Sequence, residues 1–175
     1  MPSERSRTSF EMMALMFDIR NLLRPRSRIL ENIGLEKGMK VLDYGCGPGG
    51  YVKPTMKFIG PEGYYYAVDV HPRAERYVKK VAKTNKFENV EFILTDCCTD
   101  LDDSCIDMGY LFDIYHDLKD PEPIIREIKR VLKKKGRLAM NDHHYGMEGL
   151  KKEEPIKEHF KLDRENKYTL LFKKK

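Results

Sequence analysis

A glycine-rich turn that directly follows an apolar strand constrains this chain more than any other feature. Residues 41–44 read Val-Leu-Asp-Tyr, and the next six, 45–50, include four glycines. Because glycine has no Cβ, the backbone there can bend tightly and a ligand can lie against it. A turn of this kind at the carboxyl end of a parallel strand is the geometry that a nucleotide-like cofactor needs.

Asp43 helps to distinguish between the kinds of cofactor that such a turn can hold. Gly45, Gly47 and Gly50 match the G-x-G-x-x-G pattern of dinucleotide sites, and Asp69 follows at roughly the expected ~20 residues. A carboxylate beside a doubly negative pyrophosphate would repel it, whereas S-adenosylmethionine (SAM) carries a cationic ammonium and sulfonium. We therefore expect a SAM site, with a nicotinamide or flavin site and a ligand-free structural turn as alternatives.

Strand and helix patterns alternate along most of the chain. Two late strands flank a polar turn and predict a terminal hairpin, so one strand must run antiparallel to its neighbours. The pattern predicts an α/β fold, a Rossmann-like three-layer sandwich with a mostly parallel seven-stranded sheet and an antiparallel strand from the hairpin. The expected strands are 40–44, 64–70, 90–95, 105–112, 137–141, 160–163 and 168–172, and the expected helices are 51–59, 72–85 and 121–134, the last capped by Gly136.

Two further helices are expected before the first strand, at about 9–23 and 26–33, the second ending at Gly34. We therefore divide the chain into N-terminal helices, 1–38, and a SAM-binding domain, 39–175, within a single domain overall. The first helix is rich in methionine, which adapts to irregular apolar partners. It is either a lid over the site or a helix packed on the body.

Composition indicates a globular protein and excludes several classes. Net charge is +5, but the excess lies in the lysine runs 133–135 and 173–175, which are typical of solvated ends, so a nucleic-acid partner is not expected. No apolar run is long enough to span a bilayer and no secretion signal is evident, so a cytoplasmic location is expected. The four cysteines match no zinc spacing and are expected to be free thiols.

Several motifs together resemble the class I SAM-dependent methyltransferases. They are the order of elements, the glycine turn after Asp43, the acidic residues Asp69 and Asp96, and the terminal hairpin. Segments 106–118 and 130–138 are similar to the small-molecule branch that includes ubiquinone/menaquinone-biosynthesis and arsenite methyltransferases. The resemblance covers about residues 39–141. The chain departs from the family pattern in Lys135 for a usual Gly, in Asp117 for the second His of a His-His pair, and in a short segment 142–159.

The resemblance implies which residues bind SAM. Asp43 would hold the ammonium group beside the methionine part of the cofactor. Asp69 would accept from the ribose hydroxyls, Asp96 from the adenine amino group, and Val70 would pack on the adenine face. A helix-capping role for Asp69, a loop-opening role for Asp96 and core packing for Phe112 remain alternatives. The full set of expected cofactor residues is Asp43, Tyr44, Gly45, Gly47, Asp69, Val70, Asp96, Cys97 and Phe112.

Methyl transfer from SAM is an in-line displacement, so a general base is needed only if the acceptor must lose a proton. His116 is the preferred catalytic base because imidazole accepts protons near neutral pH, with loop packing as its alternative role. The neighbouring pair His143 and His144 would need a third partner to bind a metal, so no metal is predicted. Other candidates near the mouth of the site are Tyr44, Asp113 and Asp142.

The expected function is SAM-dependent methylation of a small-molecule acceptor. An RNA or protein methyltransferase and a non-catalytic SAM-binding subunit are the alternatives. The sequence leaves the acceptor and the oligomeric state open.

Overall fold

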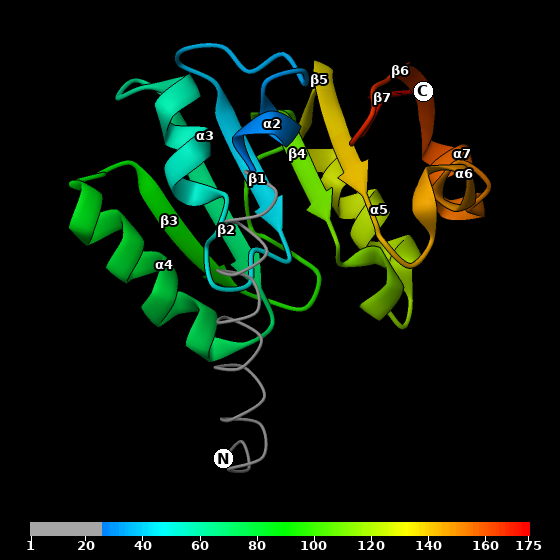
Figure 1. Cartoon of the computed structure of the whole chain (residues 1–175). Helices are drawn as coiled ribbons and strands as arrows, with labels where there is room; N and C mark the ends of the chain where they lie inside the picture. The colour runs from blue at the N-terminus through cyan, green and yellow to red at the C-terminus, as the bar shows by residue number, and fades with distance from the viewer. Residues whose placement is uncertain (1–25) are drawn as a thin grey trace.

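The computed structural model describes residues 26–175. These residues form one seven-stranded sheet with helices packed against it (Figure 1). The strand order is β3-β2-β1-β4-β5-β7-β6. β1 to β5 are parallel, and β7 is antiparallel to both of its neighbours. The predicted α/β sandwich with one antiparallel hairpin strand is confirmed. The strands are β1 (Lys40–Tyr44), β2 (Tyr64–Asp69), β3 (Val90–Leu94), β4 (Ile106–Phe112), β5 (Leu132–Asn141), β6 (Phe160–Glu165) and β7 (Leu170–Lys174).

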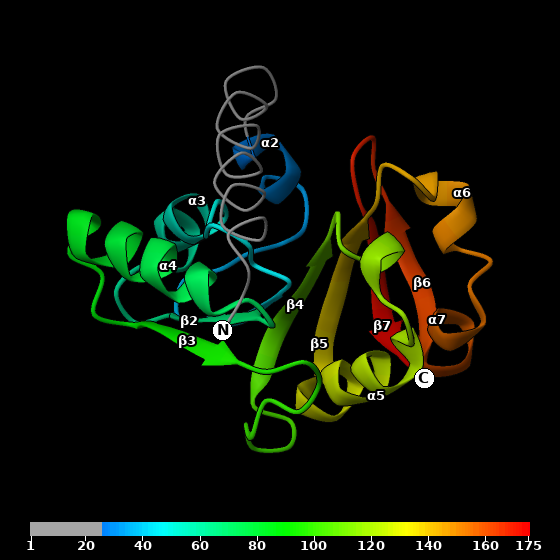
Figure 2. The ribbon, with the colours of Figure 1, turned by 90° about the horizontal axis from the view of Figure 1, so that it is seen from below.

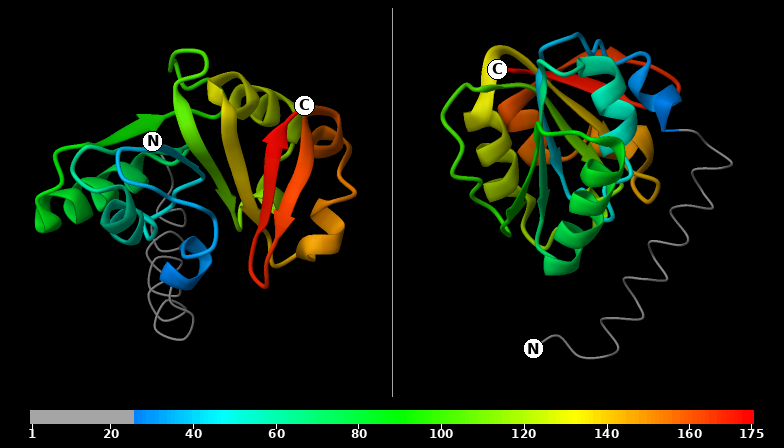
Figure 3. Two further views of the ribbon diagram at one scale, coloured as in Figure 1. Left: turned by 90° about the horizontal axis from the view of Figure 1, so that it is seen from above. Right: turned by 90° about the vertical axis from the view of Figure 1, so that its left-hand side faces the viewer.

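Helices cover both faces of the sheet, as Figure 2 and the right-hand view of Figure 3 show. Side chains alternate between the two faces along each strand. In β2, Tyr65 and Ala67 join the core under α2, α3 and α4, while Val68 joins the core under α5, α6 and α7. The helices are α2 (Ser27–Leu30), α3 (Val52–Ile59), α4 (Pro72–Asn85), α5 (Pro121–Val131), α6 (Gly146–Leu150) and α7 (Glu154–His159), with a 3₁₀ turn η1 (Tyr115–Asp117). None of these helices is both long and apolar enough to cross a bilayer.

Helix α5 ends earlier than its apolar pattern predicts, and the capping role predicted for Gly136 is wrong. The helix stops at Val131, and β5 begins at Leu132, which already pairs with Ile106 of β4. The register then shifts before pairing resumes near Gly136. Because a Cβ at Gly136 would lie 2.9 Å from the carbonyl oxygen of Ile106, this glycine permits close approach of two strands at an irregular ladder.

Other boundaries also differ from the prediction. Helix α2 has only four residues and is followed by a turn that reaches Gly34. The hairpin turn lies two residues later than expected, because Asn166 Oδ1 accepts hydrogen bonds from the N–H groups of Tyr168 and Thr169. Helices α6 and α7 occupy the segment 142–159, where no element was predicted. The predicted first helix, with its two alternative roles, lies outside the described residues.

The carboxyl ends of the five parallel strands meet along one side of the sheet, the lower side in Figure 1, which we call the carboxyl edge. The chain order reverses between β1 and β4, which lie next to each other in the sheet. In open α/β sheets, ligands bind outside the carboxyl ends at such a reversal. The carboxyl edge between β2 and β5 is therefore where a site is expected.

Candidate functional site

Three residues of the glycine turn after β1 have a left-handed backbone conformation, which is unfavourable for residues with a side chain. Gly45, Gly47 and Gly49 have φ values of +80°, +51° and +74°. A Cβ on Gly45 would lie 2.6 Å from Cγ1 of Ile114, so that position is closed by the protein itself. A Cβ on Gly47 would meet no described atom within 4 Å. The turn is thus packed on one side and open at Gly47, where a ligand can approach the main chain.

Asp69, at the end of β2, accepts hydrogen bonds from the main chain of two segments, the glycine turn and the start of the chain after β2. Its Oδ2 accepts a hydrogen bond of 2.8 Å from Gly47 N, and its Oδ1 accepts one of 2.8 Å from His71 N. The N-cap of α4 is His71, whose side chain accepts from Arg73 N, so the alternative that Asp69 caps this helix is wrong. Each carboxylate oxygen keeps a further lone pair, so Asp69 can still accept from ligand hydroxyls.

Asp43 is buried at the end of β1 rather than exposed in the turn. Only 1% of its surface is accessible, and its Oδ2 accepts a hydrogen bond from the hydroxyl of Tyr65. Burial raises the pKa of Asp43 to about 6, although the Tyr65 hydrogen bond and the positive charge of Arg26 pull it down. A cation that approached this carboxyl would favour its ionised form.

Arg26 is a residue of this region that the sequence did not indicate. Its guanidinium fills the space beside Gly50, where an added Cβ would lie 1.1 Å from Nη1, and its Cζ stands 4.9 Å from the ring centre of Tyr51. Only 8% of Arg26 is exposed. It is far from the turn in sequence, so a local motif could not have found it. The structure places a fixed positive charge next to the glycine turn.

The expected adenine residues lie along the next strand ends. Val70 has 65% of its surface exposed, which is unusual for an apolar side chain and leaves it free to cover a ligand. Asp96 is also exposed. The hydroxyl of Tyr44 donates a 2.9 Å hydrogen bond to the carbonyl of Cys97, so this tyrosine ties β1 to the loop after β3.

That loop has a second anchor, which the sequence did not indicate. Thr99 donates through both its N–H and its hydroxyl to Glu127 of α5, at 2.9 and 2.6 Å. Arg130 donates to the same carboxylate at 2.8 Å. The Arg130 hydrogen bond outweighs desolvation, and with the Thr99 bonds it lowers the pKa of Glu127 to about 2. The loop that carries Asp96 and Cys97 is therefore fixed to the body by an ionised carboxylate.

Phe112, at the end of β4, is only 6% exposed. Its ring stacks on Tyr110 with centroids 4.8 Å apart and lies 4.9 Å from Tyr51. These contacts account for the side chain as part of the core. If Phe112 contacts the cofactor, it does so through its main chain and the edge of its ring.

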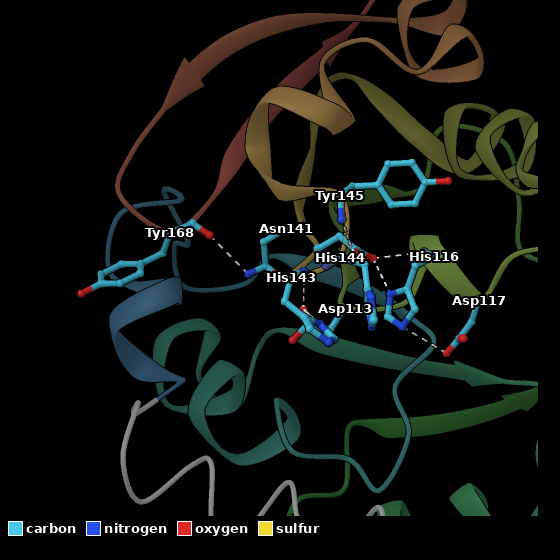
Figure 4. A network of polar contacts seen from close by, with 9 residues as sticks. Asp113, His116, Asp117, Asn141, His143, His144, Tyr145 and Tyr168 are labelled. Atoms are coloured by element: carbon cyan, nitrogen blue, oxygen red, sulfur yellow. Dashed lines mark hydrogen bonds and ion pairs between the residues drawn. The ribbon is translucent and has the colours of Figure 1, made fainter.

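Histidine and aspartate side chains gather at the ends of β4 and β5 (Figure 4). His116 Nδ1 lies 2.8 Å from Asp142 Oδ2, which also accepts from the main-chain N–H of His116 at 3.1 Å. Burial favours the neutral form of Asp142, but the hydrogen bonds from His116 and from the N–H groups of His144 and Tyr145 outweigh it and lower its pKa. An ionised Asp142 only accepts, so His116 carries its proton on Nδ1 and presents Nε2.

His143 has a similar arrangement with Asp113. His143 Nδ1 lies 3.0 Å from Asp113 Oδ1, which also accepts from the N–H of His143 at 3.1 Å. The rings of His116 and His143 both lie next to that of His144, with centroids 4.1 Å away in each case. Five of the predicted candidates therefore converge, although they come from two separate segments: Asp113, His116, Asp142, His143 and His144. Tyr44, the sixth, lies instead against the loop after β3.

Comparison with known proteins agrees with this geometry. A family model described as a methyltransferase domain matches residues 35–174, which include every strand of the sheet. A SAM-dependent methyltransferase from Aquifex aeolicus has the same fold, with a TM-score of 0.70 over 89% of this chain and 95% of that one, at 24% identity.

Curated relatives match the chain in part, as two of them illustrate. A sterol 24-C-methyltransferase of Gibberella zeae is 31% identical over 120 residues, 67% of this chain and 31% of that protein. A demethylmenaquinone methyltransferase of Staphylococcus aureus is 29% identical over 112 residues, 63% of this chain and 46% of that protein. The chain thus spans about a third to a half of these relatives.

The open main chain at Gly47, the carboxylate of Asp69 and the exposed Val70 suit the ribose and the adenine of a nucleoside cofactor such as SAM. The predictions of fold, family and cofactor are confirmed by the family match and the shared fold. The chain belongs to the class I SAM-dependent methyltransferase family, whose cofactor is SAM.

Proposed function

We propose that this chain transfers the methyl group of SAM to a small-molecule acceptor by in-line displacement. The observation that carries the proposal is the arrangement of Asp69 and Gly47. The carboxylate holds the N–H of Gly47 at 2.8 Å, while the space where a Cβ of Gly47 would point stays free of described atoms. A ribose whose hydroxyls donate to Asp69 would lie against this main chain.

The remaining cofactor groups have matching partners on the carboxyl edge. The ammonium of SAM would be attracted by Asp43, and its carboxylate by the guanidinium of Arg26 beside Gly50. Exposed Val70 would cover one face of the adenine. Asp96 and the main chain of Cys97 would meet its polar edge. We propose these roles from position and chemistry together.

The reaction asks little of the protein beyond alignment and exclusion of water, because the methyl carbon is already activated by positive sulfur. If the acceptor must lose a proton, we assign that task to His116. Its Nε2 is the basic nitrogen because Asp142 holds the proton on Nδ1 at 2.8 Å. Asp142 is then a positioning residue that sets the tautomer of the base.

The names of two relatives support a small acceptor. One is named as a sterol 24-C-methyltransferase and the other as a demethylmenaquinone methyltransferase, and both names specify a small-molecule acceptor. The chain between β5 and β6 contains the short helices α6 (Gly146–Leu150) and α7 (Glu154–His159), and we propose that the acceptor binds on this side of the carboxyl edge.

The proposal is tested with labelled SAM and a panel of acceptors: a naphthoquinol, a sterol, simple phenols, amines, RNA and a protein extract. We expect label in at least one small molecule, and loss of transfer in an Asp69→Ala variant. His116→Ala should lower kcat with little change in SAM affinity. Label only in RNA or protein would contradict the proposal, and SAM binding without transfer to any acceptor would indicate a non-catalytic subunit.

A further inference from the structure

Three histidines from two separate segments meet at the carboxyl edge (Figure 4). His116 lies in η1 after β4, whereas His143 and His144 directly follow β5, which is the next strand of the sheet. One ring nitrogen from each residue lies within 4.8 Å of the other two. Neither segment alone has a metal-binding spacing, so only the fold creates this cluster.

In two of these histidines, an aspartate carboxylate lies within hydrogen-bond distance of the ring nitrogen Nδ1. Asp142 lies 2.8 Å from Nδ1 of His116, and Asp113 lies 3.0 Å from Nδ1 of His143. Metal-bound histidines usually donate their other N–H to a carboxylate or a carbonyl, which fixes the ring and makes the free nitrogen a better ligand. Here two independent pairs have that arrangement and leave Nε2 of each ring for a ligand.

We propose that His116, His143 and His144 bind one divalent transition-metal ion. Zinc–nitrogen bonds of ~2.1 Å in a tetrahedron require ligand atoms roughly 3.4 Å apart. The side chains of His143 and His144 are exposed, so small rotations can bring the three nitrogens together. Asp117 is within reach as well, since its Oδ2 lies 3.6 Å from Nε2 of His116 and its side chain is 69% exposed.

The chemistry of the cluster favours a particular class of ion. Imidazole ligands suit Zn²⁺, Cu²⁺, Ni²⁺ and Fe²⁺, whereas Mg²⁺ and Ca²⁺ prefer oxygen. Three neutral histidines leave a tetrahedral ion with one open position, as in zinc sites that bind water or substrate. The carboxylates of Asp113, Asp117 and Asp142 surround the cluster and favour a doubly positive ion.

The cluster is close to the glycine turn. Ile114, two residues before His116, packs against Gly45 and closes that side of the turn. An acceptor oxygen or nitrogen at the open position of the metal would therefore lie at the same edge as the cofactor. This use of the metal rests on the proposed function, whereas the binding of the metal does not. While His116 holds the metal it is a ligand, and it serves as a base only in the metal-free protein.

A second group of side chains has similar spacing but different surroundings. Glu122, Glu158 and His159 also lie within ligand distance of one another. Arg126 already donates to Glu122 and supplies a positive partner for its carboxylate. His159 Nε2 lies 2.8 Å from the same carboxylate. We therefore expect no metal there, and His159→Gln provides a matched control for the loss of one histidine.

The test is calorimetric titration of ZnCl₂ into the full chain, made without a histidine tag and stripped with a chelator. We expect about one Zn²⁺ per chain with a Kd in the micromolar range or tighter. The double variant His143→Gln/His144→Gln should bind at least about 100-fold more weakly, and Asp142→Asn about 10-fold more weakly. His159→Gln should bind as the parent does. Co²⁺ in place of Zn²⁺ should show the visible absorption of a tetrahedral site in the parent and in His159→Gln, and not in the double variant.

A SAM titration of each variant separates this proposal from the previous one, and it also reports folding. Unchanged SAM affinity with lost Zn²⁺ affinity in the double variant supports the metal site. A parent protein that takes up no Zn²⁺ while binding SAM would overturn the metal site and leave the methyltransferase proposal intact. Equal Zn²⁺ binding by the parent and the double variant, or its loss in His159→Gln, would also overturn it.

Discussion

The two halves of the carboxyl edge are built in different ways. After β1 and β2, the main chain forms the candidate cofactor site: three glycines have positive φ, and Asp69 accepts hydrogen bonds from two main-chain N–H groups. After β4 and β5, side chains form it, because His116 and His143 are each held by an aspartate. The first half therefore depends on backbone shape and the second on convergence of residues that are distant in sequence. Substitutions should affect the two halves differently.

The largest effect is expected at Gly45, where Ala would need a left-handed backbone at φ +80° and would place its Cβ 2.6 Å from Ile114. We expect Gly45→Ala to lower the free energy of unfolding by about 3 kcal/mol. Gly47→Ala is the matched comparison, because its Cβ meets no described atom within 4 Å. It should cost about 1 kcal/mol and act mainly on SAM binding. Urea denaturation measures both, and equal losses in the two variants would refute the distinction.

Asp69→Ala should have the next largest effect, on affinity rather than fold. The variant loses the carboxylate that holds Gly47 and that would accept from the ribose. We expect the Kd for SAM to rise about 30-fold, or ~2 kcal/mol, by calorimetry. Asp102→Ala removes an equally negative but exposed side chain away from the edge and should leave the Kd unchanged. A similar loss in both variants would mean that only net charge matters.

The buried carboxyl of Asp43 makes SAM affinity depend on pH. Its pKa of about 6 in the folded protein means that it is mostly neutral at pH 5 and ionised at pH 7. Since the SAM ammonium favours the ionised form, affinity should fall several-fold between pH 7 and pH 5. Asp43→Asn should bind more weakly at pH 7 and lose this dependence. Parallel pH curves for the two proteins would rule out Asp43 as the titrating group.

The raised pKa of Asp43 makes the stability of the folded protein fall as pH rises, whereas SAM affinity should increase over the same range. Folding raises the pKa of Asp43 from its ordinary value of 3.8 to about 6. Between these values the folded state holds a proton that the unfolded state has lost, so this group lowers stability as pH rises through the window. Glu127 acts in the reverse sense, because its pKa is lowered to about 2 and its stabilisation is lost as pH falls below its ordinary range.

The smallest effect is expected for Tyr44→Phe, which removes a single hydroxyl. The lost hydrogen bond to the carbonyl of Cys97 should cost about 1 kcal/mol of stability in urea denaturation. SAM affinity should fall only a few-fold, because Thr99 still ties the same loop to Glu127. A loss of binding as large as that of Asp69→Ala would show that Tyr44 contributes more to the adenine side than this anchor.

The half of the carboxyl edge after β1 and β2 was predictable from the sequence because its residues form a pattern within a short stretch of the chain. Gly45 and Gly47 follow an apolar strand directly, and Asp69 ends the next one, so a short stretch of sequence contains most of the geometry. The end of α5 was not predictable in this way. The apolar pattern continues past Val131, but Leu132 pairs with β4, and this tertiary contact overrides the helical pattern.

For the half of the carboxyl edge after β4 and β5, the sequence indicated the individual histidines but not that they form a cluster. His116, His143 and His144 were each candidates near the mouth of the site, yet their convergence requires β4 and β5 to be neighbours. The one signal available was that both segments follow strands whose carboxyl ends share an edge. Arg26 had no signal at all, because its contact with Gly50 links distant parts of the chain.

The central claim is that the turn after β1 and the carboxylate of Asp69 together hold SAM. Calorimetric titration of the purified chain with SAM at neutral pH tests it most directly, with the oxidised nicotinamide dinucleotide as a parallel titrant. The account predicts one SAM per chain in the micromolar range and no uptake of the dinucleotide. Binding of the dinucleotide instead, or no heat with SAM at millimolar concentration, would contradict it.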